Sequence, residues 1–295
     1  MTGQGLKAGV MKAFNRHLAL GCLGIDQGWR SDFSFVQAAD CQLGMAYQMD
    51  NKDYSNCTWE KEMKWCNTFV SQINALHPAP RFAIICGDLV DAMPHQWKDI
   101  NTAQRKDFKE VMSQLNVPLV CVCGNHDLGN TPTTSSVQSY RDDFGDDFFS
   151  FSCGGVYFIV LNSQFYEEPS QVQDMAAEQD AWLEQQLKIV SSGAHKHSVV
   201  FQHIPWFLES EEEEKQYFNI SQPLRRNMLN KLCEAGVSKI FCGHYHRNAG
   251  GWYKDMELIV TSSLGAPLGE AVNGFRIVRV TENDIQHEYV NLTEY

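Results

Sequence analysis

Residues 120–127, VCVCGNHD, are the stretch from which the architecture of this chain follows. Four apolar, β-prone residues end at Gly124, and three side chains with ligand atoms come next, Asn125, His126 and Asp127. A buried strand that ends in an amide, an imidazole and a carboxylate is typical of the sheet edge at which an α/β protein builds a site. The alternative is a polar turn without chemistry, because Gly and Asn are also common turn residues.

Short β-prone runs with a polar or glycine-containing end recur along the chain, at residues 33–40, 81–88, 118–125, 156–162, 198–203 and 237–244. Apolar side chains at helical spacing lie between them, in residues 59–76 and again in residues 224–233, with Gly236 as a stop signal. After His246 three runs, 257–263, 274–280 and 285–292, read as consecutive strands. We therefore expect an α/β layered domain with an antiparallel tail and two sheets packed face to face.

Three segments interrupt this alternation, residues 128–147, 163–179 and 204–222, and are expected to be irregular loops or lids. The acidic run at residues 209–214 is expected to be a solvated part of the last of them. The chain is without internal repeats or an evident linker. We divide it into an N-terminal extension, residues 1–30, and a single domain, residues 31–295.

Composition restricts the class of protein. With 43% hydrophobic and 20% charged residues the chain is typical of globular proteins, and a net charge of −12 argues against a nucleic-acid surface. No apolar run reaches the roughly 20 residues that span a bilayer, and we expect no secretory signal. Four cysteines, Cys86, Cys121, Cys123 and Cys242, lie inside strand-like runs, and the sequence contains no CxxC pair. We therefore predict a cytoplasmic protein with reduced cysteines. We expect it to be monomeric and to bind neither nucleic acid nor membrane.

Ligating side chains recur at the ends of the predicted strands. Any one of them is more readily explained as a turn residue or a hydrogen-bonded side chain than as a ligand. Packing gives no reason, however, for carboxylates, amides and imidazoles to follow five of the six predicted strands that precede His246. The residues concerned are Asp40, Gln42, Asp88, Asn125, His126, His203, His244 and His246.

The ordered series D-x-Q, GD-x-x-D, GNHD, H and GHYH, over residues 33–246, resembles the calcineurin-like metallophosphoesterase superfamily, whose pattern is D-x-H, GD, GNH[DE], H and GH-x-H. The resemblance implies a four-layer α/β/β/α sandwich of two mixed sheets flanked by helices. Longer segments such as GNHDLGNTPT and VFQHIPWFLES are similar to a cytosolic branch of the family described as serine/threonine protein phosphatases. It thus implies a metal-dependent phosphomonoesterase that acts on phosphoprotein substrates.

Carried over to this sequence, the family's pattern implies two divalent metal ions that share Asp88. The first ion would be held by Asp40, Gln42, Asp88 and His246, and the second by Asp88, Asn125, His203 and His244. Such a pair can align a bridging hydroxide for in-line attack on phosphorus. By the same resemblance His126 is the general acid that protonates the leaving oxygen, and Asp91 is the carboxylate that pairs with it.

Two positions depart from the family's pattern. Gln42 stands where the family has histidine, and its harder oxygen favours Mn or Mg over Fe or Zn, which remain alternatives. The phosphoprotein phosphatases follow their acid with Arg-Gly, whereas this chain continues from Asp91 with Ala92 and Met93. The phosphate-binding arginine is therefore missing there. Arg247, directly after GHYH, is the candidate replacement, with a surface or structural role as the alternative.

Two other functions compete with this one. A phosphodiesterase or nucleotidase would use the same metal site, and Trp206, Phe207, Phe165 and Tyr166 would then either stack a base or merely pack the loops. A non-catalytic scaffold with a degenerate metal site is the second alternative, suggested by the lost histidine at Gln42. Against it, the other ligand positions and His126 are all of the right type.

Overall fold

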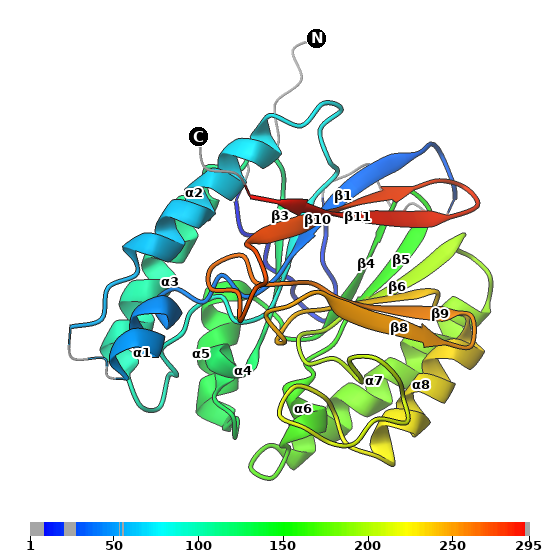
Figure 1. Ribbon diagram of the computed structural model, residues 1–295. Helices are drawn as coiled ribbons and strands as arrows, with labels where there is room; N and C mark the ends of the chain where they lie inside the picture. Colours follow the sequence, from blue (N-terminus) through cyan, green and yellow to red (C-terminus); the bar gives the residue numbers. More distant parts are fainter. Residues whose placement is uncertain (1–8, 21–27, 53, 55, 293–295) are drawn as a thin grey trace.

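Two β-sheets packed face to face form the centre of the molecule, and helices cover their outer faces (Figure 1). The computed structural model describes residues 9–20, 28–52, 54 and 56–292. The layers follow in the order helix, sheet, sheet, helix, which is the expected four-layer sandwich of two mixed sheets. Within the described residues no helix is both long enough and apolar enough to cross a bilayer.

The first sheet has five strands in the order β11-β10-β1-β2-β3. Its strands β1, β2 and β3 are parallel, whereas β10 runs antiparallel to both β1 and β11. The bounds are β1 (Phe33–Ala38), β2 (Ala83–Cys86), β3 (Leu119–Val122), β10 (Gly274–Val280) and β11 (Ile285–Asn291). The three parallel strands therefore end at the same edge of the sheet. The GNHD motif, residues 124–127, lies at this edge because it directly follows β3.

The second sheet has six strands in the order β4-β5-β6-β7-β9-β8. Four inner strands are parallel, and the edge strands β4 and β8 pair antiparallel with their neighbours. The bounds are β4 (Phe149–Cys153), β5 (Val156–Val160), β6 (His197–Phe201), β7 (Lys239–Cys242), β8 (Ala249–Tyr253) and β9 (Met256–Val260). In this sheet too the parallel strands bring their carboxyl ends to one edge.

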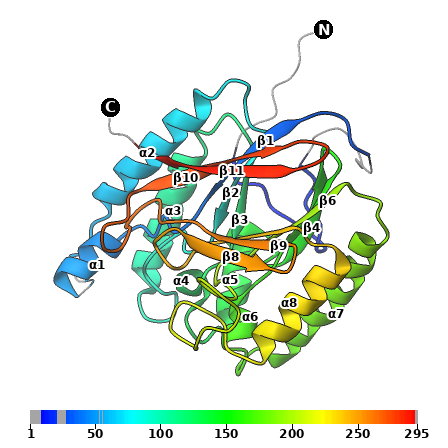
Figure 2. The same ribbon diagram turned by 45° about the vertical axis from the view of Figure 1, so that its right-hand side comes forward.

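Helices pack by their apolar faces on the outer side of each sheet (Figures 1 and 2). The first sheet is covered by α2 (Glu60–Asn74), α3 (Lys98–Met112) and α5 (Thr134–Phe144). The second sheet is covered by α7 (Gln173–Ser191) and α8 (Leu224–Ala235). Three short helices lie in the connections, α1 (Met45–Asn51), α4 (Asn125–Leu128) and α6 (Gln164–Glu167).

Phenylalanines from both sheets fill the space between them. Phe35 of β1 stacks on Phe82, just before β2, with ring centroids 4.9 Å apart, and meets Phe158, Phe201 and Phe241 of the second sheet edge-on. All five rings are fully buried. Edge-to-face aromatic pairs favour one relative placement of the layers, so this core fixes the strand ends of the two sheets with respect to each other.

All nine predicted strands are confirmed. The helices in residues 59–76 and 224–233 are confirmed too, and the second is followed by Gly236 with φ 103°. The prediction that residues 128–147 are irregular was wrong, because α5 lies within them. Its sequence is rich in Ser and Thr, which favour turns, yet Thr133 caps the helix by accepting the N–H of Ser136 at 3.2 Å. Similarly, residues 163–179 contain α6 and the start of α7.

The C-terminal strands divide between the two sheets. We predicted a wholly antiparallel tail; β10 and β11 confirm it, but β9 pairs parallel with β7 in the other sheet. Two strands, β4 and β8, were not predicted. In β8 the sequence AGGWY contains two glycines, which are poor strand formers, so its pairing with β9 rather than local propensity makes it a strand.

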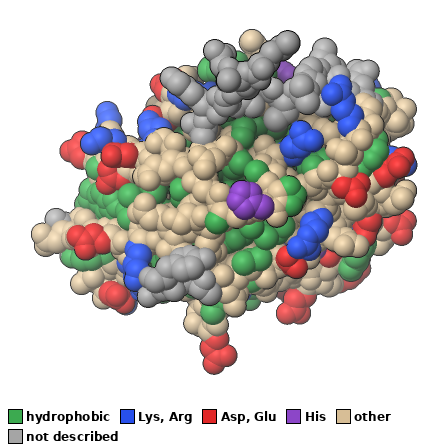
Figure 3. Space-filling view, turned by 90° about the horizontal axis from the view of Figure 1, so that it is seen from above, with side chains coloured by type: hydrophobic (Ala, Val, Ile, Leu, Met, Phe, Trp, Pro, Cys, Tyr) green, Lys and Arg blue, Asp and Glu red, His purple; other side chains and the backbone are tan. Residues whose placement is uncertain are grey.

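The described part of the N-terminal segment lies against both sheets. Val10 forms a bridge with Leu119, and His17 forms one with Ser150. Leu18 is buried between the sheets. Residues 9–20 thus contribute to the core, and the division of the chain at residue 30 stays a prediction. On the face seen from above, acidic and basic side chains are interspersed rather than gathered by sign (Figure 3).

Candidate metal centre

The ligating side chains predicted from the sequence leave the ends of parallel strands in both sheets. Asp40 and Gln42 follow β1, Asp88 follows β2, Asn125 follows β3, His203 follows β6, and His244 and His246 follow β7. Because the two sheets are packed with these ends together, residues up to 206 positions apart in the chain meet, as the Asp40–His246 contact shows. All seven side chains are buried.

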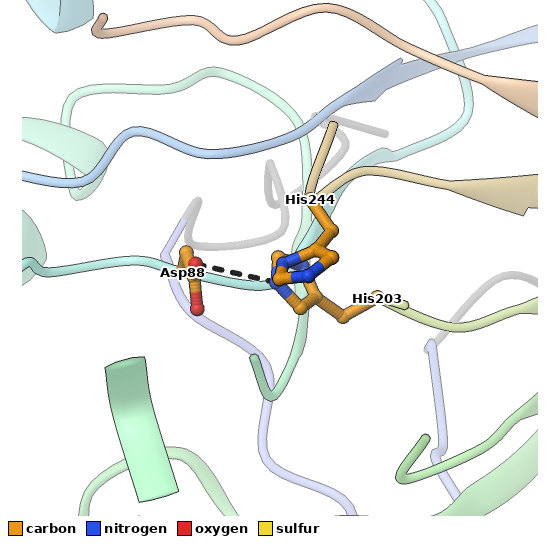
Figure 4. Close-up of side chains that lie close together, drawn as sticks. All are labelled: Asp88, His203 and His244. Carbon is orange, nitrogen blue, oxygen red and sulfur yellow. Dashed lines mark hydrogen bonds and ion pairs between the residues drawn. The ribbon is translucent and has the colours of Figure 1, made fainter. Parts of the chain in front are cut away.

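One group of candidate ligands consists of Asp88, His203 and His244, whose side chains converge in Figure 4. The Nε2 atom of His203 lies 3.2 Å from Oδ2 of Asp88 and 3.1 Å from Nδ1 of His244. The same Nε2 atom is 3.1 Å from Oδ1 of Asn125. Two imidazole nitrogens, a carboxylate oxygen and an amide oxygen therefore face one another, in a chemistry suited to a divalent cation.

A second group consists of Asp40, Asp88 and His246, and it shares Asp88 with the first. Nε2 of His246 lies 3.3 Å from Oδ1 of Asp40. Within each group the ligand atoms lie within 4.8 Å of one another. A carboxylate common to two clusters is the arrangement that two neighbouring ions need, since such ions lie about 3.5–4 Å apart.

Backbone carbonyls fix the orientation of all three imidazoles. The second ring nitrogen of each donates a hydrogen bond: His203 Nδ1 to Cys86 O at 2.8 Å, His246 Nδ1 to Ala266 O at 2.6 Å, and His244 Nε2 to Tyr217 O at 3.2 Å. A carbonyl only accepts, so that nitrogen carries a proton, and the other ring nitrogen is the one that faces the cluster and can bind a metal ion in place of a second proton. Metal-binding histidines are usually held in this way.

Unusual backbone conformations are concentrated at the candidate ligands. Asp40, Gln42, Asp88, His244 and His246 all have positive φ, between 42° and 70°. Residues other than glycine rarely adopt this region of φ. Each one that does destabilises the fold by about 1–3 kcal/mol. Conformations of this kind cluster at functional sites, where the surrounding structure holds them, and packing alone does not account for five where the strand ends of the two sheets meet.

The glycines of the motifs allow close approach of the ligands. A Cβ atom on Gly87 would lie 2.2 Å from Nδ1 of His203, and one on Gly124 would lie 2.1 Å from Oδ1 of Asp88. Both distances are far below ordinary contact. The glycine before each of Asp88 and Asn125 is therefore required by the space that the site leaves, which explains the GD and GNHD patterns physically.

Gln42 tests whether the set of residues fits a cation. Its Nε2 donates to Oδ1 of Asp91 at 3.1 Å, which turns its Oε1 away from that carboxylate. Oε1 is buried and has no hydrogen-bond partner among the described residues. A buried acceptor without a partner costs about 1–3 kcal/mol, and a bound cation would satisfy it. Together with the lone pairs of the three histidines, this orphaned oxygen fits a metal centre.

The protonation states of the buried ligands depend strongly on one another. Burial acts to lower the pKa of His203, but Asp88 outweighs it and raises that pKa to about 9. Burial and the charge on His203 together lower the pKa of His244 to about 3. Burial likewise acts to raise the pKa of Asp88, yet His203 and His126 bring it below its usual range. The carboxylate is therefore anionic at neutral pH, as a metal ligand must be.

His126 stands at the rim of the cluster, with 19% of its side chain exposed. Its Nδ1 donates to the backbone oxygen of Asp91 at 2.6 Å and lies 3.3 Å from Oδ1 of that residue. Its backbone N–H donates to Oδ1 of Asp88 at 2.8 Å. The ring is thus fixed through Nδ1, and within the described part of the chain Nε2 has no hydrogen-bond partner.

Two residues support the cluster without belonging to either ligand group: Tyr54, which no sequence pattern marks, and Asp127 of the GNHD motif. The hydroxyl of Tyr54 donates to Oδ2 of Asp91, so that carboxylate receives Tyr54, Gln42 and His126 together. Asp127, the last residue of GNHD, is fully buried and is not among the candidate ligands. Its carboxylate accepts the N–H groups of Gly124 at 2.8 Å and Leu89 at 3.1 Å, which ties the loops after β3 and β2 together.

Arg247 is placed differently from the candidate ligands. Its guanidinium carbon lies 4.9 Å from the centroid of the Tyr245 ring, and its Nε is near Gly269. Tyr217 instead reaches the cluster from the loop of residues 204–222. Its hydroxyl is 3.4 Å from Nδ2 of Asn125, and 58% of the residue is exposed. Sequence reasoning missed it because an exposed tyrosine in a polar loop has no distinguishing pattern.

The acidic run is only partly a solvated face. The carboxylate of Glu213 accepts the backbone N–H groups of Leu208 at 2.8 Å and Glu209 at 2.9 Å. Asn219, fully buried, donates to the same carboxylate at 2.6 Å. Glu213 therefore organises this loop from within, while Glu211 and Glu212, its neighbours, are half-buried and exposed, respectively.

Residues 34–248 match the sequence profile of calcineurin-like phosphoesterases. The chain belongs to the calcineurin-like phosphoesterase family. Members of the family use a dinuclear metal site, and the two groups that share Asp88 are the candidate for it in this chain.

Relatives of this family member include the serine/threonine-protein phosphatase CPPED1 of Homo sapiens. It is 44% identical over 272 residues, which cover 90% of this chain and 86% of the relative. The CPPED1 protein of Danio rerio is 42% identical over 270 residues, with 90% and 87% covered. The similarity extends well beyond the motifs, and it covers most of each protein.

Solved structures share the fold at low sequence identity. A dimetal phosphatase from Danio rerio aligns with TM-score 0.65 and 14% identity over 90% of this chain and 98% of its own. GAP50, the anchor in the inner membrane complex of Plasmodium, aligns with TM-score 0.63 and 15% identity over 90% and 86%. These likenesses concern the fold alone, so the chemistry has to be argued from the residues.

Proposed function

We propose that this chain is a dinuclear metal-dependent phosphomonoesterase that removes phosphate from phosphoserine or phosphothreonine in proteins. The observation that carries the proposal is the pair of buried ligand groups sharing Asp88. The substrate class is supported by the 44% identity to a protein named serine/threonine-protein phosphatase. The intact ligand set argues against the scaffold alternative.

The residues proposed to hold the ions are those inferred from the motifs. Asp40, Gln42, Asp88 and His246 would hold one, and Asp88, Asn125, His203 and His244 the other. When bound, two divalent ions polarise the phosphoryl oxygens and activate water for in-line attack. The glutamine and asparagine oxygens and the two aspartates form a predominantly hard donor set, which supports Mn or Mg as the ions used, before Fe or Zn.

His126 is proposed to be the general acid. Its Nδ1 is engaged by Asp91, so its Nε2 is the nitrogen that can protonate a leaving alkoxide. Asp91 would keep the ring oriented through the contacts of its backbone oxygen and carboxylate with Nδ1. Arg247 is proposed to bind a phosphate oxygen; for this its side chain has to leave the position over Tyr245.

The nucleotidase alternative loses its sequence support in the structure. Trp206, Phe207 and Phe165 are at most 2% exposed, and Tyr166 is 8% exposed. Side chains so deeply packed are not available to stack a base, so they pack the loops around the centre. We therefore retain phosphomonoester hydrolysis and do not propose a nucleotide substrate.

A substrate panel tests the proposal. Purified protein, stripped with a chelator and resupplied with Mn or Mg, is assayed on p-nitrophenyl phosphate, bis-p-nitrophenyl phosphate, a cyclic nucleotide and a phosphoserine peptide. We expect metal-dependent turnover of the monoester and the peptide. Turnover confined to the diester or the cyclic nucleotide would replace the proposal with a phosphodiesterase.

We further propose that the enzyme acts in the cytoplasm as a monomer, without nucleic-acid or membrane partners. Cys41, Cys66, Cys86 and Cys121 are buried free thiols, which suits a reducing compartment. Light scattering at micromolar concentration and fractionation of cells expressing the tagged chain test the two statements. A stable dimer or a membrane-pelleting fraction would contradict them.

A further inference from the structure

A small pocket adjoins the candidate centre on the side of Asn125 and His244. Its volume is about 270 Å³, and Tyr217, Gln164 and Glu168 also line it. Binding sites for whole small molecules occupy about 300–1,000 Å³, so this pocket is of a size for one side chain. It opens directly beside the place where the proposed reaction occurs, and a residue neighbouring the phosphorylated one can reach it.

One of the residues that line this pocket, Gln164, has a buried amide oxygen without a hydrogen-bond donor in the described part of the chain. Only 3% of Gln164 is exposed to solvent. Its Nε2 donates to the backbone oxygen of Asn130 at 2.6 Å, which directs Oε1 elsewhere. That Oε1 has no hydrogen-bond partner among the described residues. An occupant with N–H groups would supply the missing donor, and an occupant without them would leave it unsatisfied.

The pocket is also negatively charged. Glu167 is paired with Lys215, whose Nζ lies 2.6 Å from Oε1, so its charge is compensated. Glu168 instead accepts the backbone N–H of Ser170 at 3.2 Å, and the hydrogen bonds of Ser170 lower its pKa. It therefore remains an anion whose charge no described ion pair balances. Neither Lys nor Arg is among the described residues that line the pocket.

We propose that this pocket is a specificity subsite for a basic side chain, lysine or arginine, within two residues of the phosphorylated residue of a polypeptide substrate. The proposal rests on the function proposed above and names the class of phosphoprotein that the site prefers. A cationic side chain supplies donors to Gln164 and charge to Glu168. A second phosphate or an acidic side chain would be repelled by Glu168 and would find no donor there.

The test compares phosphoserine peptides that carry Arg, citrulline or Glu at each of the two positions on either side of the phosphoserine. At one of these positions we expect kcat/KM for Arg to exceed that for Glu by roughly tenfold or more, through KM, as one charge-assisted hydrogen bond predicts. Citrulline keeps the shape and donors but not the charge, and should fall between them. Added salt should reduce the preference.

Variants locate the preference in the pocket. Glu168→Gln and Gln164→Leu should each reduce the Arg-to-Glu ratio of kcat/KM, and Glu168→Gln, on a half-buried residue, is the variant that leaves the core intact. Glu234→Gln is the matched control, because it removes one negative charge from an exposed position on α8 outside the pocket. It should leave the ratio unchanged.

Two negative results have different meanings. Equal kcat/KM for all peptides, with metal-dependent turnover of p-nitrophenyl phosphate intact, would overturn the subsite and leave the phosphatase function standing. A preference for Arg that Glu234→Gln removes as fully as Glu168→Gln does would overturn it as well, since the effect would then be one of net charge. Absence of metal-dependent turnover on every substrate would overturn both proposals.

Discussion

Replacing Gly124 by alanine tests the steric argument behind the GNHD motif. The backbone there has φ −113° and ψ −178°, so alanine can adopt it without strain. Its Cβ, however, would lie 2.1 Å from Oδ1 and 2.3 Å from the backbone nitrogen of Asp88. Ordinary contact begins near 3.4 Å, so the loops after β2 and β3 have to separate by roughly 1.3 Å. That moves Asp88, the ligand common to both groups, relative to Asn125.

A displacement of about 1 Å in a catalytic arrangement can reduce the rate about 100-fold, and overpacking typically destabilises a fold by about 1–3 kcal/mol. We therefore expect Gly124→Ala to lower kcat on p-nitrophenyl phosphate at saturating Mn by about two orders of magnitude. The free energy of unfolding, from urea titration, should fall by about 1–3 kcal/mol.

Gly193→Ala is the matched control for this variant. Gly193 has φ 69° and open space around its Cβ position, so alanine there introduces backbone strain far from the centre. It should destabilise the fold by about 1 kcal/mol and leave kcat unchanged. A Gly124→Ala enzyme with kcat within about threefold of the wild type would refute the claim that the glycine is required by the approach of Asp88.

Three further changes have defined outcomes. His126→Ala should lower kcat on a phosphoserine peptide by about 10²–10⁴-fold. The loss on p-nitrophenyl phosphate should be much smaller, because the nitrophenolate leaving group needs no protonation. Equal losses on the two substrates in steady-state assays would contradict the role of His126 as general acid. Gln42→His should raise affinity for Zn in calorimetric titrations relative to Mn, and an unchanged metal ranking would mean that Gln42 is not a ligand. Although burial acts to raise it, hydrogen bonds from His287 and Lys239 lower the pKa of Glu257 to about 2. Glu257 thus stabilises the fold above pH 4.5, and this contribution is lost as pH falls toward 2. Urea titrations of Glu257→Gln should show a deficit at pH 7 that shrinks below pH 4.5; a deficit independent of pH would contradict the pKa shift.

The sequence is informative about the centre because its ligands are short polar motifs directly after buried strands. Strand ends in a parallel sheet converge by geometry, so Asp40, Asp88 and Asn125 could be grouped without coordinates. The pattern also predicted the helix that ends at Gly236. Periodicity and turn chemistry are local signals, and these features depend on local sequence.

Other parts of the site depend on contacts between distant segments. Tyr54 reaches Asp91 across 37 positions, and Tyr217 reaches Asn125 across 92. Neither residue has a pattern that separates it from other tyrosines in loops. The helix α5 was missed for a related reason, since Ser and Thr disfavour a helix locally while burial of Val137 against the first sheet stabilises it. Tertiary packing outweighs propensity there.

The role proposed for Arg247 shows the limit of adjacency in sequence. It directly follows the GHYH motif, yet its guanidinium lies over Tyr245. His244 and His246 point into the cluster while the next side chain leaves it, as successive residues in a turn commonly do. Position next to a motif therefore predicts the neighbourhood of a side chain and not its direction.

The measurement that tests the central claim most directly is the metal content of the protein set against its turnover. Wild-type chain and Asp88→Ala are stripped with a chelator, titrated with Mn, and followed by elemental mass spectrometry and p-nitrophenyl phosphate hydrolysis in the same samples. Asp88 belongs to both ligand groups. We predict that wild-type activity reaches its maximum at two ions per chain, and that folded Asp88→Ala is inactive and retains fewer than two ions. Near-normal turnover of Asp88→Ala, or full wild-type activity without bound metal, would contradict a dinuclear centre.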